Sequence, residues 1–205
     1  WELGSNGPAG TDTEMFYDIT ENGLGDMSVE QFKKADQSQN IVEIWNDVFM
    51  EFEKKNGKVV VKLNQKNVYT GAGLERLCIV MQKKNNVFAT DLFEPIMSKI
   101  DEFTTTSDIK ARRIVADHIR TSVFMIADGV TPSNTDRGYI LRRLIRRAVR
   151  YADKLDMKEG SLSWIALTVI EKYRETYLSL EQQKDLISKQ IDSEESKFRK
   201  TLDAG

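Results

Sequence analysis

The chain has 205 residues, of which 40% are hydrophobic and 30% charged, with a formal net charge of −2. This is ordinary for a globular protein with one large domain or two small ones, and no apolar run approaches the roughly eighteen residues of a membrane helix. A single cysteine and a single histidine exclude an internal disulfide and a typical zinc site, so we expect a cytoplasmic protein with no structural metal and no membrane partner.

The chain begins at Trp1 and has no signal-peptide pattern, so we expect upstream residues to have been removed or left out. The first forty residues are rich in Gly, Asp, Ser, Thr and Asn, which indicates loops with short strands. The next elements are a strand, an Asn-Gly hairpin turn, a returning strand, a short strand and an apolar helix. We expect these at Ile41–Phe52, Asn56–Gly57, Val59–Leu63, Val68–Thr70 and from Gly71 to about Met81.

From about Asp91 the pattern is helical to the end of the chain. A polar break at Thr104–Asp108 offers Ser107 or Asp108 as an N-cap. The predicted helices are Asp91–Phe103, Lys110–Ile126, Gly138–Asp153, Ser161–Tyr177 and Ser179–Leu202. A strand region is thus followed by a helical region, with the boundary near residues 84–90.

The basic residues concentrate between Lys110 and Arg150, where ten basic and three acidic residues give +7 and leave −9 for the remainder. On an ideal helix, five arginines share one face of Gly138–Asp153 opposite an apolar face: Arg142, Arg143, Arg146, Arg147 and Arg150. Arginine's planar fork suits phosphate oxygens, so this face predicts contact with a nucleic acid. The alternatives are a solvated face or ion pairs with acidic parts of the chain.

Two further segments carry polar groups suited to a small ligand. Between strand and helix, Gly71 and Gly73 would let a ligand approach the backbone, and Arg76 would reach a phosphate. The segment lacks the spacing of a dinucleotide fingerprint or a P-loop, and a packing turn is the alternative. Asn46 is a polar side chain within an apolar strand, which suits a substrate hydrogen bond or a solvent-facing position.

Together these segments resemble alanyl-tRNA synthetases. The motifs, in the order of that family, are Gly-Pro-x-Gly, Glu-Ile-Trp-Asn-x-Val-Phe-Met-x-Phe, Thr-Gly-x-Gly-Leu-Glu-Arg, Ala-Asp-His-Ile-Arg, Ala-Asp-Gly-Val-x-Pro-Ser-Asn and Arg-Gly-Tyr-x-Leu-Arg-Arg-x-Ile-Arg-Arg-Ala-Val-Arg. The resemblance covers nearly the whole chain and implies an α+β fold. Residues 1–85 would be the C-terminal part of a class II catalytic core with its antiparallel sheet, and residues 86–205 an α-helical region that recognises the tRNA acceptor stem.

The resemblance implies a ligase that activates alanine with ATP and Mg²⁺ and transfers it to tRNA. The first two class II motifs lie upstream in the family, so no complete catalytic set is expected here and this chain alone is expected to be inactive. A non-catalytic RNA-binding module and one half of a split synthetase are the alternatives. The implied contacts are Trp1, Asn46, Gly71 and position 69 for alanine, Gly73 and Arg76 for ATP, and Asn134, Arg137, Arg143 and Arg147 for tRNA. Tyr69 stands where the family usually has an Asp that holds the substrate's ammonium group.

Overall fold

The computed structural model describes residues 1–203, and these divide into two compact units, one from Trp1 to Thr90 and one that begins at Asp91. Unit 1 contains the whole sheet, and unit 2 is helical. The observed class is therefore α+β, as predicted. The units divide between Thr90 and Asp91, five residues beyond the limit of 85 expected for the first region.

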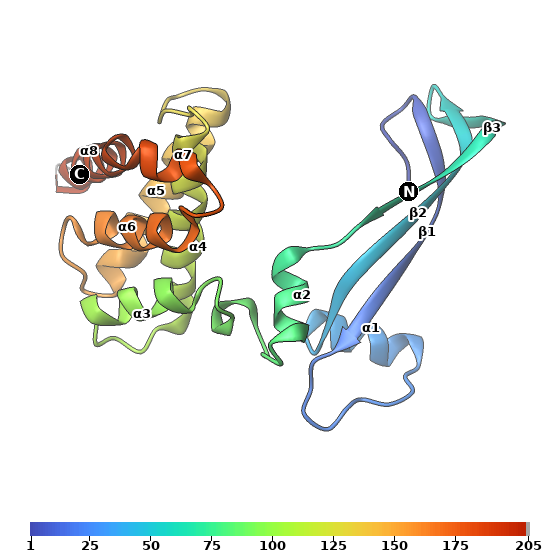
Figure 1. Cartoon of the computed structure of the whole chain (residues 1–205), viewed down its shortest axis with the longest axis horizontal. Coiled ribbons are helices and arrows are strands. Elements are labelled where there is room, and N and C mark those ends of the chain that lie inside the picture. Colours follow the sequence, from blue (N-terminus) through green and yellow to red (C-terminus); the bar gives the residue numbers. More distant parts are fainter. Residues whose placement is uncertain (204–205) are drawn as a thin grey trace. The chain divides into compact units, whose positions relative to one another are not determined.

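Unit 1 is built on a three-stranded antiparallel sheet of order β1-β2-β3 (Figure 1). β2 (Ile41–Lys55) and β3 (Lys58–Gly71) form the predicted hairpin. Asn56 and Gly57 have φ of 49° and 77°, the left-handed conformation that a two-residue turn with the native strand twist requires. Two separate returning strands were expected, but β3 is continuous, because register shifts within the hairpin absorb the irregular stretch without ending the pairing.

The first forty residues differ most from expectation. They form a twelve-residue strand, β1 (Gly7–Asp18), and a helix, α1 (Val29–Gln37). β1 is rich in residues that disfavour strands, but its backbone pairs with β2 along its whole length, so tertiary pairing overrides propensity. The helix begins at a capping box in which Ser28 and Gln31 exchange side-chain to backbone hydrogen bonds, a signal that the sequence did contain.

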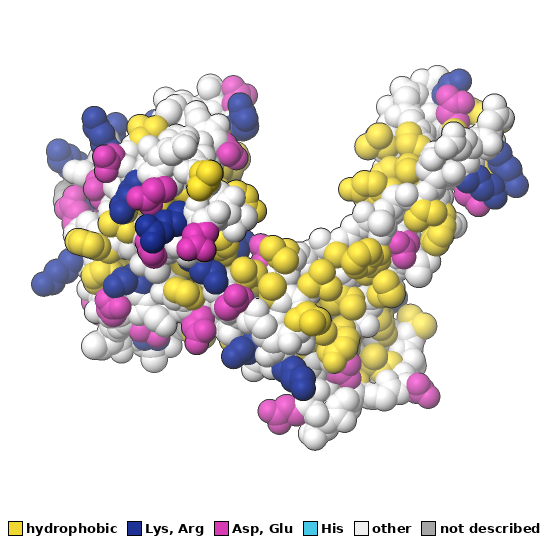
Figure 2. All heavy atoms as spheres, in the orientation of Figure 1, with side chains coloured by type: hydrophobic (Ala, Val, Ile, Leu, Met, Phe, Trp, Pro, Cys, Tyr) yellow, Lys and Arg dark blue, Asp and Glu magenta, His cyan; other side chains and the backbone are white. Residues whose placement is uncertain are grey.

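A close approach between β1 and β2 depends on Gly10. A Cβ atom at this position would lie 1.7 Å from the backbone oxygen of Phe49, next to the register shift between Ala9 and Gly10. Few side chains of this unit are fully buried, and every residue of β3 except Leu63 is exposed. The sheet then leads into α2 (Leu74–Met81) and a short 3₁₀ turn, η1 (Val87–Ala89). In Figure 2, hydrophobic side chains gather over α2 and the adjoining part of the sheet.

Unit 2 is a bundle of helices, and the first three predicted helices are confirmed to within about three residues at each end, whereas the fourth ends at Tyr173, four residues before the predicted Tyr177. Asp108 caps the second helix of the unit by accepting a hydrogen bond of 2.9 Å from the backbone nitrogen of Ala111. The segment predicted as the last helix forms two helices, because the chain turns at Gln183. The helices are α3 (Glu94–Phe103), α4 (Ile109–Ala127), α5 (Asp136–Lys154), α6 (Ser161–Tyr173), α7 (Leu178–Gln182) and α8 (Lys184–Asp203).

The core of unit 2 lies where α4, α5, α6 and α8 pack against one another. Its largest side chains are fully excluded from solvent and come from all four helices. α5 contributes Leu141 and Ile145, and α8 contributes Ile187 and Ile191. The apolar stripe of each amphipathic helix therefore faces this core, as helical periodicity predicts.

We expect Ile145→Ala to destabilise unit 2 by about 2–5 kcal/mol, because it removes buried methyl groups and leaves a cavity among close-packed neighbours. Ile140→Ala is the matched control, since Ile140 lies on the same helix with 48% of its surface exposed, and it should change stability by less than about 0.5 kcal/mol. Urea unfolding followed by far-ultraviolet circular dichroism measures both. Equal stabilities would contradict the placement of the core on this face of α5.

Candidate functional site

The first candidate site lies on one face of the sheet, around Asn46. Asn46 of β2 pairs with Glu14 of β1 on one side and with Gly71 of β3 on the other. Its Nδ2 donates a hydrogen bond of 3.2 Å to Oε1 of Glu14. A Cβ atom at Gly71 would have no neighbour within 4 Å, so the surface beside Asn46 is open. This row combines an amide, a carboxylate and free space for a small group.

A second row lies two residues further along β2. Val48 is buried and pairs with Asp12 of β1 and Tyr69 of β3. Side chains alternate between the faces of a sheet with period two, so this row shares its face with Asn46. The Tyr69 ring is 60% exposed and offers no negative charge to a ligand. The carboxylates of this face are those of Asp12 and Glu14.

Trp1 lies on the outer side of β1. Its backbone nitrogen and oxygen pair with the oxygen and nitrogen of Gly10 at 3.0 and 3.1 Å. The same nitrogen lies 3.5 Å from Oδ1 of Asp12. The structure therefore brings Trp1 to the end of the second row, while Asn46, Tyr69 and Gly71 lie in the two rows themselves.

The start of α2 carries the residues predicted to meet a phosphate. Gly73 is the N-cap and supplies no side-chain hydrogen bond, which leaves the amides of the first turn without a side-chain cap. Arg76 is 51% exposed in its side chain, and its Nη1 lies 2.7 Å from Oε2 of Glu43 on β2. Glu43 was not predicted as a partner. Glu43 is the first residue of the Glu-Ile-Trp-Asn motif, but 33 residues separate it from Arg76, so the sequence did not indicate that the two side chains pair.

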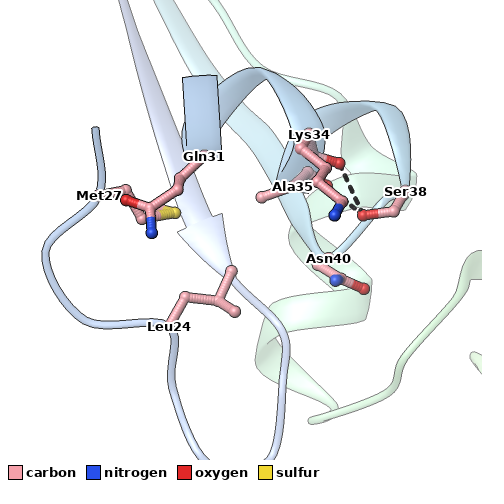
Figure 3. Close-up of a pocket in the computed structure, with 7 residues that line it drawn as sticks. All are labelled: Leu24, Met27, Gln31, Lys34, Ala35, Ser38 and Asn40. Atoms are coloured by element: carbon pink, nitrogen blue, oxygen red, sulfur yellow. Dashed lines mark hydrogen bonds between the residues drawn. The ribbon is translucent and has the colours of Figure 1, made fainter. Parts of the chain in front are cut away.

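Two hollows in the described surface of unit 1 lie away from these rows. Figure 3 shows one of about 220 Å³, lined by the loop around Leu24 and Met27 and by α1 residues including Gln31 and Lys34. Within residues 1–203, no three His, Cys, Asp or Glu side chains are placed to hold a metal ion. No helix in this range is long and apolar enough to cross a membrane.

The second candidate site is the arginine helix α5 and the loop before it. Gly138 in its first turn is required, because a Cβ atom there would lie 2.2 Å from Oγ of Ser133 and 2.4 Å from the backbone oxygen of Thr131. This packing holds the loop against the helix. Asn134 follows in the loop, and its Oδ1 accepts a hydrogen bond from Nη1 of Arg142.

The five arginines are not equivalent, and the prediction of one continuous basic face is wrong for two of them. Glu194 of α8 is almost fully buried, and its Oε1 lies 2.7 Å from Nε of Arg146 and 3.5 Å from Nε of Arg142. The guanidinium groups of Arg146 and Arg150 also lie 5.1 and 5.5 Å from the centre of the Phe198 ring. The ion-pairing alternative therefore holds for Arg142 and Arg146. The acid that neutralises them lies about fifty residues away, where sequence reasoning could not find it.

Arg143 and Arg147 lie on the other side of the basic face and are exposed. Arg143 is 5.6 Å from the centre of the Tyr139 ring, and Arg147 is 5.8 Å from that of Tyr151. Arg137 is also exposed, at the start of α5. The structure thus leaves Arg137, Arg143 and Arg147 at the surface.

Asp117 on α4 interacts electrostatically with Arg147. Its pKa lies below the ordinary range, first because Nδ1 of His118 hydrogen-bonds its Oδ2 at 2.9 Å, and also because Arg120 and Arg147 favour the charged form. Asp117 is therefore an anion at neutral pH. Its charge partly offsets that of Arg147.

The pKa of Glu195 on α8 is shifted in the direction opposite to that of Asp117. Glu195 is fully buried, and its Oε1 accepts hydrogen bonds of 3.0 and 2.8 Å from Nε and Nη2 of Arg199. Burial raises its pKa above the ordinary range, since the loss of hydration outweighs the attraction of Arg199.

Because the Glu195 pKa is raised in the folded state, the stability that its protonation contributes is present at low pH and is lost as pH rises through the folded pKa. We expect the difference in unfolding free energy between the wild type and Glu195→Gln to vary with pH above about 4.3, in the direction that penalises the wild type as pH increases. Urea unfolding at a series of pH values measures it. A pH-independent difference would show that Glu195 has the same pKa in both states.

Comparison with known proteins identifies the family. The chain matches the family described as tRNA synthetases class II (A) over residues 1–205. It is 39% identical over 207 residues to an alanine–tRNA ligase of Stenotrophomonas maltophilia, 40% over 207 residues to one of Francisella philomiragia, and 36% over 211 residues to one of Staphylococcus saprophyticus. Each match covers 100% of this chain and 23–24% of the relative, so the chain spans about a quarter of the length of these curated relatives. Because the family match extends over every residue, the chain belongs to the class II tRNA synthetases (A).

Proposed function

We propose that this chain is part of an alanine–tRNA ligase, which activates alanine with ATP and transfers it to tRNA. The observation that carries the proposal is whole-chain similarity to alanine–tRNA ligases at 36–40% identity in three species. That similarity includes the sheet and the basic helix together, and so favours a ligase over a non-catalytic module or a split synthetase. The cytoplasmic location expected from the sequence is part of the proposal.

The alanine subsite would lie on the sheet face that carries Asn46. Alanine presents an ammonium group, a carboxylate and one methyl group, so its site needs a few polar anchors and little space. The amide of Asn46 supplies a hydrogen-bonding anchor, and the open surface at Gly71 accommodates the small substrate. Trp1 would close the end of the site beside Asp12. Tyr69 contributes ring surface, and the ammonium group would depend on the carboxylates of Asp12 and Glu14 on the same face.

The ATP subsite would lie at the start of α2. The open amides of its first turn and the Arg76 guanidinium are suited to phosphate oxygens, which supports the assignment of Gly73 and Arg76. Mg²⁺ bound with ATP would supply further neutralisation of the phosphates. Arg76 would exchange Glu43 for phosphate, which is feasible because both side chains reach solvent.

The RNA subsite would lie on unit 2, with Asn134, Arg137, Arg143 and Arg147 as contacts to the acceptor stem. All four residues are exposed. Within this proposal, residues 1–85 belong to the catalytic core and residues 86–205 to the tRNA-recognition region. The hydrogen bond between Asn134 and Arg142 supports the assignment, because it fixes the loop side chain against α5, the helix that carries the exposed arginines.

We expect Gly71→Ala, introduced into the full-length ligase, to raise KM for alanine about tenfold or more in alanine-dependent ATP–pyrophosphate exchange, because the added methyl group fills space needed by the substrate. Thermal stability should not fall, since the new Cβ meets nothing within 4 Å. Val68→Ala is the matched control on the same strand with its side chain on the other face, and it should leave KM unchanged. An unchanged KM in Gly71→Ala would remove this residue from the alanine subsite.

We expect the 205-residue chain to bind an alanine tRNA acceptor-stem hairpin with an affinity that falls as salt is raised, because arginine–phosphate contacts release counterions. The double variant Arg143→Glu with Arg147→Glu should lose at least tenfold in affinity and show a smaller salt slope. Lys158→Glu with Lys189→Glu changes net charge equally at exposed positions off α5 and is the control. Electrophoretic mobility shifts at several salt concentrations measure all three. Equal losses in both double variants would indicate only a long-range charge effect.

A further inference from the structure

The basic face of α5 has two sides that differ in what their arginines contact. On one side, Arg142 and Arg146 are paired with Glu194. On the other side, no ion pair joins Arg143 or Arg147 to a carboxylate anywhere in residues 1–203. Leaving a buried carboxylate without its partner is costly, so the first two arginines stay paired with Glu194, while Arg143 and Arg147 are available to a ligand.

The available side also carries two aromatic rings at regular spacing. Tyr139, Arg143, Arg147 and Tyr151 follow one another at intervals of four residues, so they lie on successive turns along one edge of the helix. Tyr139 is 45% exposed, and each arginine lies beside a tyrosine ring. We call these four residues the α5 stripe.

The composition of the α5 stripe favours RNA over a protein partner. Two guanidinium groups without an acid among the four residues attract a polyanion, and the planar fork of arginine matches phosphate oxygens. The exposed ring of Tyr139, next to the first of these cations, is suited to stacking on a base, and bases are accessible in RNA where a strand is unpaired. A protein partner would need a desolvated apolar centre, whereas both arginines of the stripe are exposed.

We propose that Tyr139, at the first turn of the α5 stripe, stacks on an unpaired base of the RNA next to the phosphates held by Arg143 and Arg147. The proposal rests on the tRNA-binding function proposed above, and it adds that Tyr139 binds an unpaired base. It also assigns Glu194 as a positioning residue, which holds Arg142 and Arg146 away from the RNA.

The test compares two RNA hairpins with the same acceptor-stem duplex, one with a single-stranded 3′ extension and one blunt, bound to the 205-residue chain. Tyr139→Leu keeps an apolar side chain but removes the ring, and it should lose about five- to tenfold in affinity for the extended hairpin and little for the blunt one. Tyr139→Phe should restore wild-type binding to the extended hairpin. Trp164→Leu, which removes an exposed ring from α6, is the control and should change neither affinity.

The outcomes separate the two proposals. If the wild type binds neither hairpin, the proposed tRNA-binding function fails. If the wild type binds but Tyr139→Leu loses equally on both hairpins, or on neither, the stacking role of Tyr139 is overturned.

A second experiment tests the two sides of the basic face. Arg142→Gln should reduce stability and leave the salt slope of binding unchanged, whereas Arg143→Gln should lower the slope by about one phosphate contact. The reverse result would overturn the assignment of the stripe, and preferential binding of an acidic protein would point to the other class of partner.

Discussion

The organisation of the helical unit depends on one buried carboxylate. Glu194 is 3% exposed and forms ion pairs with the guanidinium groups of Arg142 and Arg146 from α5. An unpaired charge at this depth would be strongly destabilising, so the pair fixes how α8 lies against α5. The next residue, Glu195, reinforces the same contact through Arg199, which also reaches Asp153 of α5. Because Glu194 occupies one side of the basic face, it determines which arginines of α5 remain at the surface.

The sheet of unit 1 obeys a different constraint, the register of its strands. The tight turn at Asn56–Gly57 sets the hairpin, and the pairing of β2 with β1 then brings Glu14 beside Asn46. A slip of one residue between β2 and β3 would move Asn46 and Gly71 to opposite faces, and a slip between β1 and β2 would remove Glu14 from the face of Asn46. Gly10 protects the register on the β1 side, because any side chain there would collide with the backbone at Phe49.

Local signals in the sequence predicted the hairpin turn, the cap at Asp108 and the amphipathic pattern of α5, because each depends on residues within one or two turns of chain. The strand β1 was not predicted, since its Gly, Pro and Asp residues disfavour strands and the pairing with β2 holds it extended. The partners of the candidate site residues were also missed. Glu14 lies 32 residues from Asn46, and Glu194 lies 48 from Arg146, so only the folded chain reveals these pairs. Sequence patterning therefore named candidate binding residues, but it could not show which of them are paired within the folded chain.

The distinction between Arg76 and Arg146 follows from the exposure of their partners. Both guanidinium groups lie 2.7 Å from a glutamate oxygen. The side chain of Glu43 is 28% exposed, whereas that of Glu194 is 4% exposed. If Arg76 turned to a phosphate, water would rehydrate Glu43, and the exchange would cost little. If Arg146 did so, Glu194 would be left as a buried, unpaired anion, which the phosphate contact would have to offset. An arginine whose acid partner reaches water is thus free to change partners, and this favours Arg76 as a ligand-binding residue and Arg146 as a structural one.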